Sequence, residues 1–87
     1  MRIVVVYKEF SDYAREVTDW IDTFEKRSGQ TVEQLDPESP DGEMFCSSRD
    51  ITRYPTVAVV DNDGKTYEMW PGTPLPIIDE VMSYLTR

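Results

Sequence analysis

The sequence contains no histidine and only one cysteine, Cys46. Without an imidazole base no Ser-His or Cys-His nucleophile pair can form, so the hydrolases that depend on such a pair are excluded. A lone cysteine cannot form an internal disulfide, and it leaves no soft-ligand cluster for zinc. We therefore expect no metal site.

Basic residues are also scarce. The chain has nine Lys and Arg against 17 Asp and Glu, which gives a formal net charge of −8. A field of that sign repels polyanions, so nucleic acid is not an expected partner, and the same charge favours solubility. No apolar run approaches the roughly 20 residues of a membrane helix. The run at residues 3–7 is too short for a signal-peptide core. We expect no membrane association and a cytoplasmic location.

The length of 87 residues suits one small domain, and no linker or repeat divides it, so we expect a single domain over residues 1–87. Residues 3–7, all β-branched or aromatic, predict a buried strand of the kind found in parallel sheets. A helix follows, with an apolar stripe at helical spacing made by Ala14, Val17, Ile21 and Phe24. Ser11 or Asp12 is expected to cap this helix by accepting hydrogen bonds from its free N–H groups, and Gly29 to end it.

The rest of the chain is predicted to form a strand at 31–35, a polar loop at 36–43, a short helix at 44–51, a strand at 56–60, a tight hairpin at 61–64, a returning strand at 65–70 and a last amphipathic helix at 75–85. Met44, Phe45 and Ile51 are expected to face inward. The order is β-α-β-α-β-β-α, which predicts an α/β fold with a four-stranded mixed sheet flanked by helices. The first crossover is expected to be right-handed, with its two strands parallel.

This order, together with the stretch "RYPTVAVV" at residues 53–60, resembles the thioredoxin fold in its minimal glutaredoxin-like form. The resemblance covers nearly the whole chain. In thioredoxin-like proteins an X-Pro-Thr at this point carries a cis proline beside the active-site turn, which implies a cis bond between Tyr54 and Pro55. The residues alone also fit an ordinary trans proline at the head of a strand.

Glutaredoxins place Cys-Pro-Tyr-Cys after the first strand, at the start of the first long helix. On this chain the motif falls on the four residues Ser11-Asp12-Tyr13-Ala14. The tyrosine agrees and both cysteines are absent, and no shift of register supplies one. The resemblance thus implies a family active site in which the CxxC motif is replaced by Ser-Asp-Tyr-Ala. An engineered replacement of both cysteines is the alternative.

In the family the first cysteine is a thiolate, because the helix N-terminus lowers its pKa, and the second cysteine resolves the mixed disulfide. Ser11 cannot replace that thiolate, since an alkoxide is far harder to form and no histidine accepts the proton. We therefore expect no thiol-disulfide exchange at this site and favour a protein that is not an enzyme. On the thioredoxin pattern Cys46 occupies a small, inward-facing position, which favours a packed core thiol. A redox role for Cys46 is the alternative.

In the family the residue before the cis proline presents its backbone N–H and C=O to a bound peptide, which pairs with them as a short added strand. That residue is Tyr54 here. The resemblance thus implies a groove for a peptide or protein partner, formed by Phe10, Ser11, Asp12, Tyr13, Ala14, Arg53, Tyr54, Pro55 and Thr56. Trp70 is expected nearby, with Lys8 adding positive charge. Phe10 and Trp70 could instead complete the core.

No cofactor is expected. Glutaredoxins commonly follow their last strand with a Gly-Gly turn and an aspartate that help hold glutathione, whereas this chain has Pro71-Gly72-Thr73-Pro74. The missing aspartate argues against glutathione, although Lys8 matches a basic position of the family. Asp61 and Asp63 precede Gly64 as in a calcium loop, but the twelve-residue spacing that ends in a glutamate is missing, and a hairpin explains them.

Three functions remain open from the sequence. The first is a thioredoxin-like binding module without redox activity. The second is a thiol-disulfide oxidoreductase or glutaredoxin-related protein of cell redox homeostasis that uses Cys46 or an unrecognised site. The third is a remnant domain whose role is stability alone, for example as a subunit of something larger.

Overall fold

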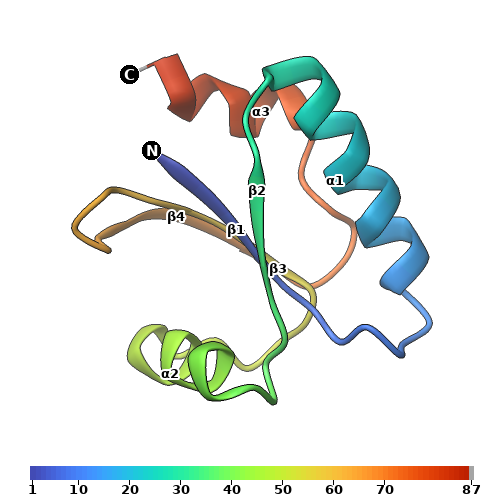
Figure 1. Cartoon of the computed structure of the whole chain (residues 1–87), viewed down its shortest axis with the longest axis vertical. Coiled ribbons are helices and arrows are strands. Elements are labelled where there is room, and N and C mark those ends of the chain that lie inside the picture. Colours follow the sequence, from blue (N-terminus) through green and yellow to red (C-terminus); the bar gives the residue numbers. More distant parts are fainter. Residues whose placement is uncertain (87) are drawn as a thin grey trace.

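A four-stranded sheet with helices on both faces is the framework of the chain (Figure 1). The computed structural model describes residues 1–86. Its elements in chain order are β1 (Arg2–Val6), α1 (Ala14–Ser28), β2 (Val32–Leu35), α2 (Pro40–Arg49), β3 (Thr56–Val60), β4 (Thr66–Pro71), α3 (Ile78–Met82) and the 3₁₀ helix η1 (Ser83–Thr86). The predicted β-α-β-α-β-β-α order is therefore confirmed.

The sheet has the strand order β2-β1-β3-β4. β1 pairs parallel with β2, with Ile3 opposite Val32, and antiparallel with β3, with Val5 opposite Val57. β3 and β4 form the antiparallel hairpin. The mixed sheet and the parallel first crossover follow the prediction, and β1 and β3, which are apolar after their first residues Arg2 and Thr56, are the two central strands.

The sheet separates two apolar clusters, because successive side chains of a strand point to opposite faces. Ile3 and Val5 of β1 pack in a cluster with α1 and with Val81 of α3. Val4 and Val6 pack on the other face, against Cys46 of α2. Figure 1 shows α1 and α3 on one side of the sheet and α2 on the other.

The start of α1 differs from the prediction. The helix begins at Ala14, and its N-cap residue is Tyr13, without a side-chain capping bond. Ser11 lies two residues before the cap position, where its hydroxyl donates to the Lys8 carbonyl (2.6 Å) instead. Asp12 is exposed in the turn. The prediction that Ser11 or Asp12 caps this helix is thus wrong. The expected end is confirmed, since Gly29 is left-handed (φ 72°) and its N–H donates to Glu25.

Helix α2 begins earlier than predicted. Ser39 is its N-cap, and the Ser39 hydroxyl accepts from the Gly42 N–H (3.0 Å), with Pro40 in the first turn. Half of the predicted loop at 36–43 is therefore helical. Ser-Pro is both a turn signal and a helix start, and here the second role holds.

The earlier start also changes which side chains α2 buries. Gly42 and Cys46, four residues apart, are both buried, Gly42 against the backbone of Asp36 and Cys46 against the sheet. Met44 lies between them on the opposite side of the helix and is 72% exposed, so the prediction that it faces inward is wrong. Phe45 is half-buried, and Ile51, beyond the end of the helix, is buried as expected.

The last predicted helix, 75–85, is shorter in the structure. Residues 72–77 form an irregular segment in which Leu75 packs half-buried on the α1 cluster. The Trp20 indole N–H donates to the Pro76 carbonyl (2.9 Å) and ties this segment to α1. Prolines at 74 and 76 keep the chain from helical geometry until Ile78.

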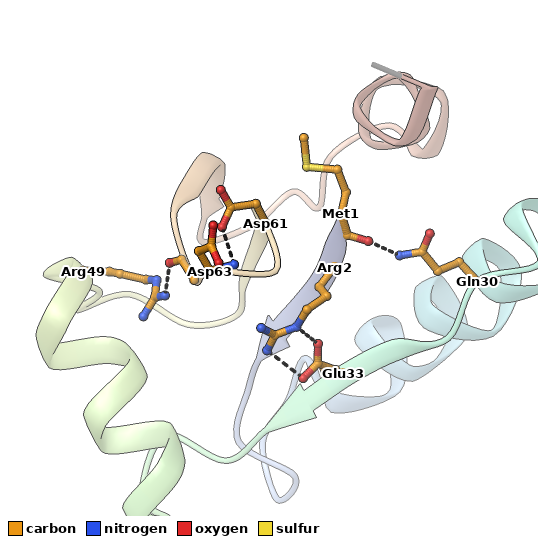
Figure 2. A network of polar contacts seen from close by, with 8 residues as sticks. Met1, Arg2, Gln30, Glu33, Arg49, Asp61 and Asp63 are labelled. Carbon is orange, nitrogen blue, oxygen red and sulfur yellow. Dashed lines mark hydrogen bonds and ion pairs between the residues drawn. The ribbon is translucent and has the colours of Figure 1, made fainter.

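Polar contacts fix the edges of the sheet (Figure 2). Arg2 makes two hydrogen bonds to Glu33 across β1 and β2 (2.6 and 3.0 Å). Arg49 of α2 donates to the Gly64 carbonyl (2.7 Å) and so attaches the hairpin turn to α2. Asp61 accepts from the backbone of that turn, as expected for a hairpin.

Residues 1–86 show neither a metal site nor a membrane span. They contain no cluster of three or more metal-ligating side chains. They also contain no helix that is both long and apolar enough to span a membrane.

Candidate functional site

The residues that the sequence singled out meet at one end of the sheet. Val6, the last residue of β1, pairs with Thr56, the first residue of β3. The segment that leaves β1, 7–13, therefore lies beside the segment that enters β3, 52–55. Antiparallel pairing of the two central strands thus places these two segments at the same end of the sheet.

The peptide bond between Tyr54 and Pro55 is cis. Pro55 and Thr56 are both buried, and the Thr56 hydroxyl donates to the Arg53 carbonyl (2.6 Å). The Pro55 carbonyl accepts from the Gly72 N–H (2.7 Å), which joins this loop to the segment after β4. These two hydrogen bonds, together with the burial of Pro55 and Thr56, hold the proline loop in place.

The backbone of Tyr54 is left unpaired. Within residues 1–86, neither its N–H nor its C=O takes part in a hydrogen bond. The residue lies just before β3, whose own backbone is paired on both sides. The donor and acceptor of the Tyr54 backbone thus have no partner within residues 1–86.

The side chain of Tyr54 turns toward α2. Its hydroxyl meets the Cys46 thiol, and the Lys8 ammonium lies 5.8 Å from the centre of its ring. Burial, with the neighbouring Cys46 next, raises the pKa of the Tyr54 phenol. Lys8 also lies 3.7 Å from the carboxylate of Glu38. Tyr54 therefore closes the α2 side of the site and stays neutral at pH 7.

Tyr13 lies on the α1 side of the same site. Its hydroxyl accepts from the Lys8 N–H (3.3 Å), and it lies near enough to Tyr54 to contribute to the raised pKa there. Ala14, the first residue of α1, is half-buried behind it. Two tyrosines and one lysine thus form the centre of the site.

Phe10 extends from the loop into solvent and is 96% exposed, so the alternative in which it completes the core is wrong. It lines a hollow of about 320 Å³ together with Lys8, Asp36 and Glu38. An exposed aromatic ring beside a hollow is a feature of protein interaction sites.

Trp70 does not belong to this site. It pairs with Val57 and therefore faces the α1 side of the sheet, while Tyr54 packs on the α2 side. Its indole N–H donates to Glu80 (3.0 Å). The expectation that it lies near Tyr54 is wrong, because strand register decides the face and the sequence alone left the register of β4 open.

Cys46 is 5% exposed in the α2 cluster, as expected for a core thiol. Burial raises the pKa of the thiol, and the Tyr54 hydroxyl and the Arg49 charge offset only part of this effect. A protonated, buried thiol is a poor nucleophile.

Arg53 is exposed, and its guanidinium lies against Gly72. A Cβ at Gly72 would come within 2.7 Å of a guanidinium nitrogen. Gly72, Asp36 and Glu38 are site residues that sequence reasoning did not place here. The sequence did mark Gly72 as part of a chain break after β4, but nothing in the local sequence distinguishes Asp36 and Glu38 from the other acidic residues.

Comparison with known proteins bears on the fold. No protein-family model matches the chain, and no curated protein is similar to it in sequence. The structure is similar to that of thioredoxin 1 from the thermophilic eubacterium Thermosipho africanus TCF52B, with a TM-score of 0.69 and 16% identity over 99% of this chain and 91% of that one. The fold is therefore thioredoxin-like. At a sequence identity this low, the structural similarity supports the fold but not the activity.

Proposed function

We propose that this thioredoxin-like chain binds an extended peptide segment of a partner protein beside Tyr54 and Pro55, and that it does not perform thiol-disulfide exchange. The unpaired backbone of Tyr54 carries the proposal. A peptide that adds as a short strand gains hydrogen bonds from this donor and acceptor, and neighbouring side chains supply selectivity.

The side chains around this backbone support a peptide ligand. Phe10 offers nearly its whole ring for burial, and Tyr13 adds a second aromatic surface on the α1 side. Arg53 presents an exposed cation at the other end of the loop. Aromatic and arginine side chains contribute most of the binding energy at many interfaces.

The proposal that exchange is absent rests on the two residues that the resemblance places where glutaredoxins keep their cysteines, Ser11 and Ala14. Ser11 lies in the turn before α1 and Ala14 is the first residue of that helix, and neither side chain can form or resolve a mixed disulfide. The alternative oxidoreductase would depend on Cys46, whose burial and raised pKa disfavour attack on a disulfide. Glutathione is not part of the proposal, because the chain has Pro71-Gly72-Thr73-Pro74 where glutaredoxins have a Gly-Gly turn and an aspartate.

Selection from a random peptide library, followed by titration of the selected peptide into ¹⁵N-labelled protein, tests the proposal. We expect amide shifts at Tyr54 and in the 10–14 loop. Phe10→Ser should weaken binding by about tenfold, because an aromatic ring that becomes buried on binding contributes about 1.5 kcal/mol or more.

Met44→Ser is the matched control, because Met44 is another exposed apolar side chain (72%) and lies on α2. It should leave the affinity unchanged. Selection of no peptide, or shifts that map away from Tyr54, would contradict the proposal.

A further inference from the structure

A second hollow lies between α1 and the segment that precedes α3. It encloses about 350 Å³, and its apolar lining is Trp20, Pro74, Leu75 and Ile78. Figure 1 shows the orange segment after β4 running beside α1. None of these residues belongs to the surface around Tyr54, so this groove is a separate feature of the molecule.

The floor of the groove is preformed. The Trp20 ring stacks on buried Phe24, with ring centres 5.2 Å apart and an interplanar angle of 12°. Its indole N–H is held by the Pro76 carbonyl (2.9 Å). A rigid aromatic floor binds an apolar side chain without the entropic cost of ordering the site.

The rim of the groove is acidic. Glu16 and Asp19, on successive turns of α1, line the groove and are exposed. Neither forms an ion pair with any residue in the range 1–86, whereas Asp22 on the same helix is paired with Lys26. The net charge of −8 adds to the negative potential at this rim.

We propose that the groove docks a partner segment in which an apolar side chain is flanked by lysine or arginine. The apolar side chain covers Trp20 and Leu75, and the flanking cations meet Glu16 and Asp19. Charge complementarity selects this partner, since an acidic segment would be repelled by both carboxylates. This inference does not depend on the function proposed for the surface around Tyr54.

Two synthetic nonapeptides test the proposal, each with a central leucine, one flanked by lysines and the other by glutamates. The readout is the Trp20 indole N–H resonance in ¹⁵N spectra. We expect the lysine-flanked peptide to shift this resonance saturably, the glutamate-flanked peptide to leave it in place, and replacement of the leucine by serine to abolish the shift.

Charge-reversal variants distinguish binding at this groove from attraction by the net charge of the whole protein. The double variant Glu16→Lys with Asp19→Lys should lower the affinity for the lysine-flanked peptide at least tenfold. Asp41→Lys with Asp63→Lys brings the same net charge of −4, since each reversal adds two charges to the −8, and both side chains are exposed away from the groove. The affinity of this control variant for the lysine-flanked peptide should stay within about threefold of that of the unmutated protein.

Equal weakening in the two double variants would overturn the proposal, because binding would then follow net charge alone. Equal binding of both peptides, or shifts that spare Trp20, would also overturn it. A Trp20 shift that depends on protein concentration alone, with a dimer in sedimentation, would assign the groove to a second copy of the chain instead.

Discussion

Gly42→Ala tests the structure, because we expect it to destabilise the protein although alanine generally stabilises a helix relative to glycine. Alanine in a helix is normally about 1 kcal/mol more favourable than glycine. Gly42 lies in the first turn of α2 and is buried. A Cβ there would lie 1.8 Å from the backbone oxygen of Asp36, against a practical minimum of 3.0 Å. The two segments must therefore separate by about 1.2 Å.

That separation disrupts the start of α2. The Asp36 carbonyl accepts from the Ser39 N–H (3.0 Å) and the Ser39 hydroxyl (2.7 Å), and the same hydroxyl caps the helix by accepting from the Gly42 N–H (3.0 Å). Each of these bonds contributes about 1 kcal/mol. Their combined loss exceeds the helix-propensity gain, so we expect Gly42→Ala to lower the free energy of unfolding by about 2 kcal/mol.

Urea denaturation followed by tryptophan fluorescence measures this change. Ser47→Ala is the matched control, because Ser47 is exposed on the same helix and should show only the propensity gain of a few tenths of a kcal/mol. A Gly42→Ala variant as stable as the parent, or more stable, would refute the close approach of α2 to Asp36.

Three further predictions concern single groups. Burial raises the pKa of the Cys46 thiol above its ordinary 9.0, so the contribution of the buried thiol to stability is complete below pH 9.0 and is lost as the pH rises through the raised value. Unfolding measured at increasing alkaline pH should reveal this loss of stability, and the loss should be smaller in Cys46→Ala. Gly72→Ala should lower stability by about 1–2 kcal/mol in urea denaturation, because φ is +76°, and should move the Arg53 side-chain N–H resonance. Arg2→Ala should cost at most about 1 kcal/mol, an effect that 1 M salt removes, because Arg2 and Glu33 are 42% and 46% exposed.

The elements that the sequence predicted well are those with one dominant local signal. Residues 3–7 are all β-branched or aromatic, and residues 56–60 are β-branched except for Ala58. Both segments form central strands, and the first strand ends at Val6. The stripe of α1 and Gly29 similarly set that helix and its end. Local patterns succeed here because burial on both faces, or on one stripe, leaves few alternatives.

The features that the sequence missed depend on contacts between distant segments. Ser11 could not be excluded as a cap without knowing that the turn places its hydroxyl on Lys8. The face of Trp70 is set by its register with Val57. The groove at Trp20 needs Pro76, 56 residues away, to form its floor. No local window contains such information.

Insulin-disulfide reduction in the presence of dithiothreitol tests the central claim most directly, that the chain keeps the fold of a thioredoxin without its exchange chemistry. We predict that the native chain reduces insulin at the background rate. Ser11→Cys with Ala14→Cys should gain activity, because it introduces two thiols at the start of α1. Turnover by the native chain above background, abolished in Cys46→Ala, would contradict the account.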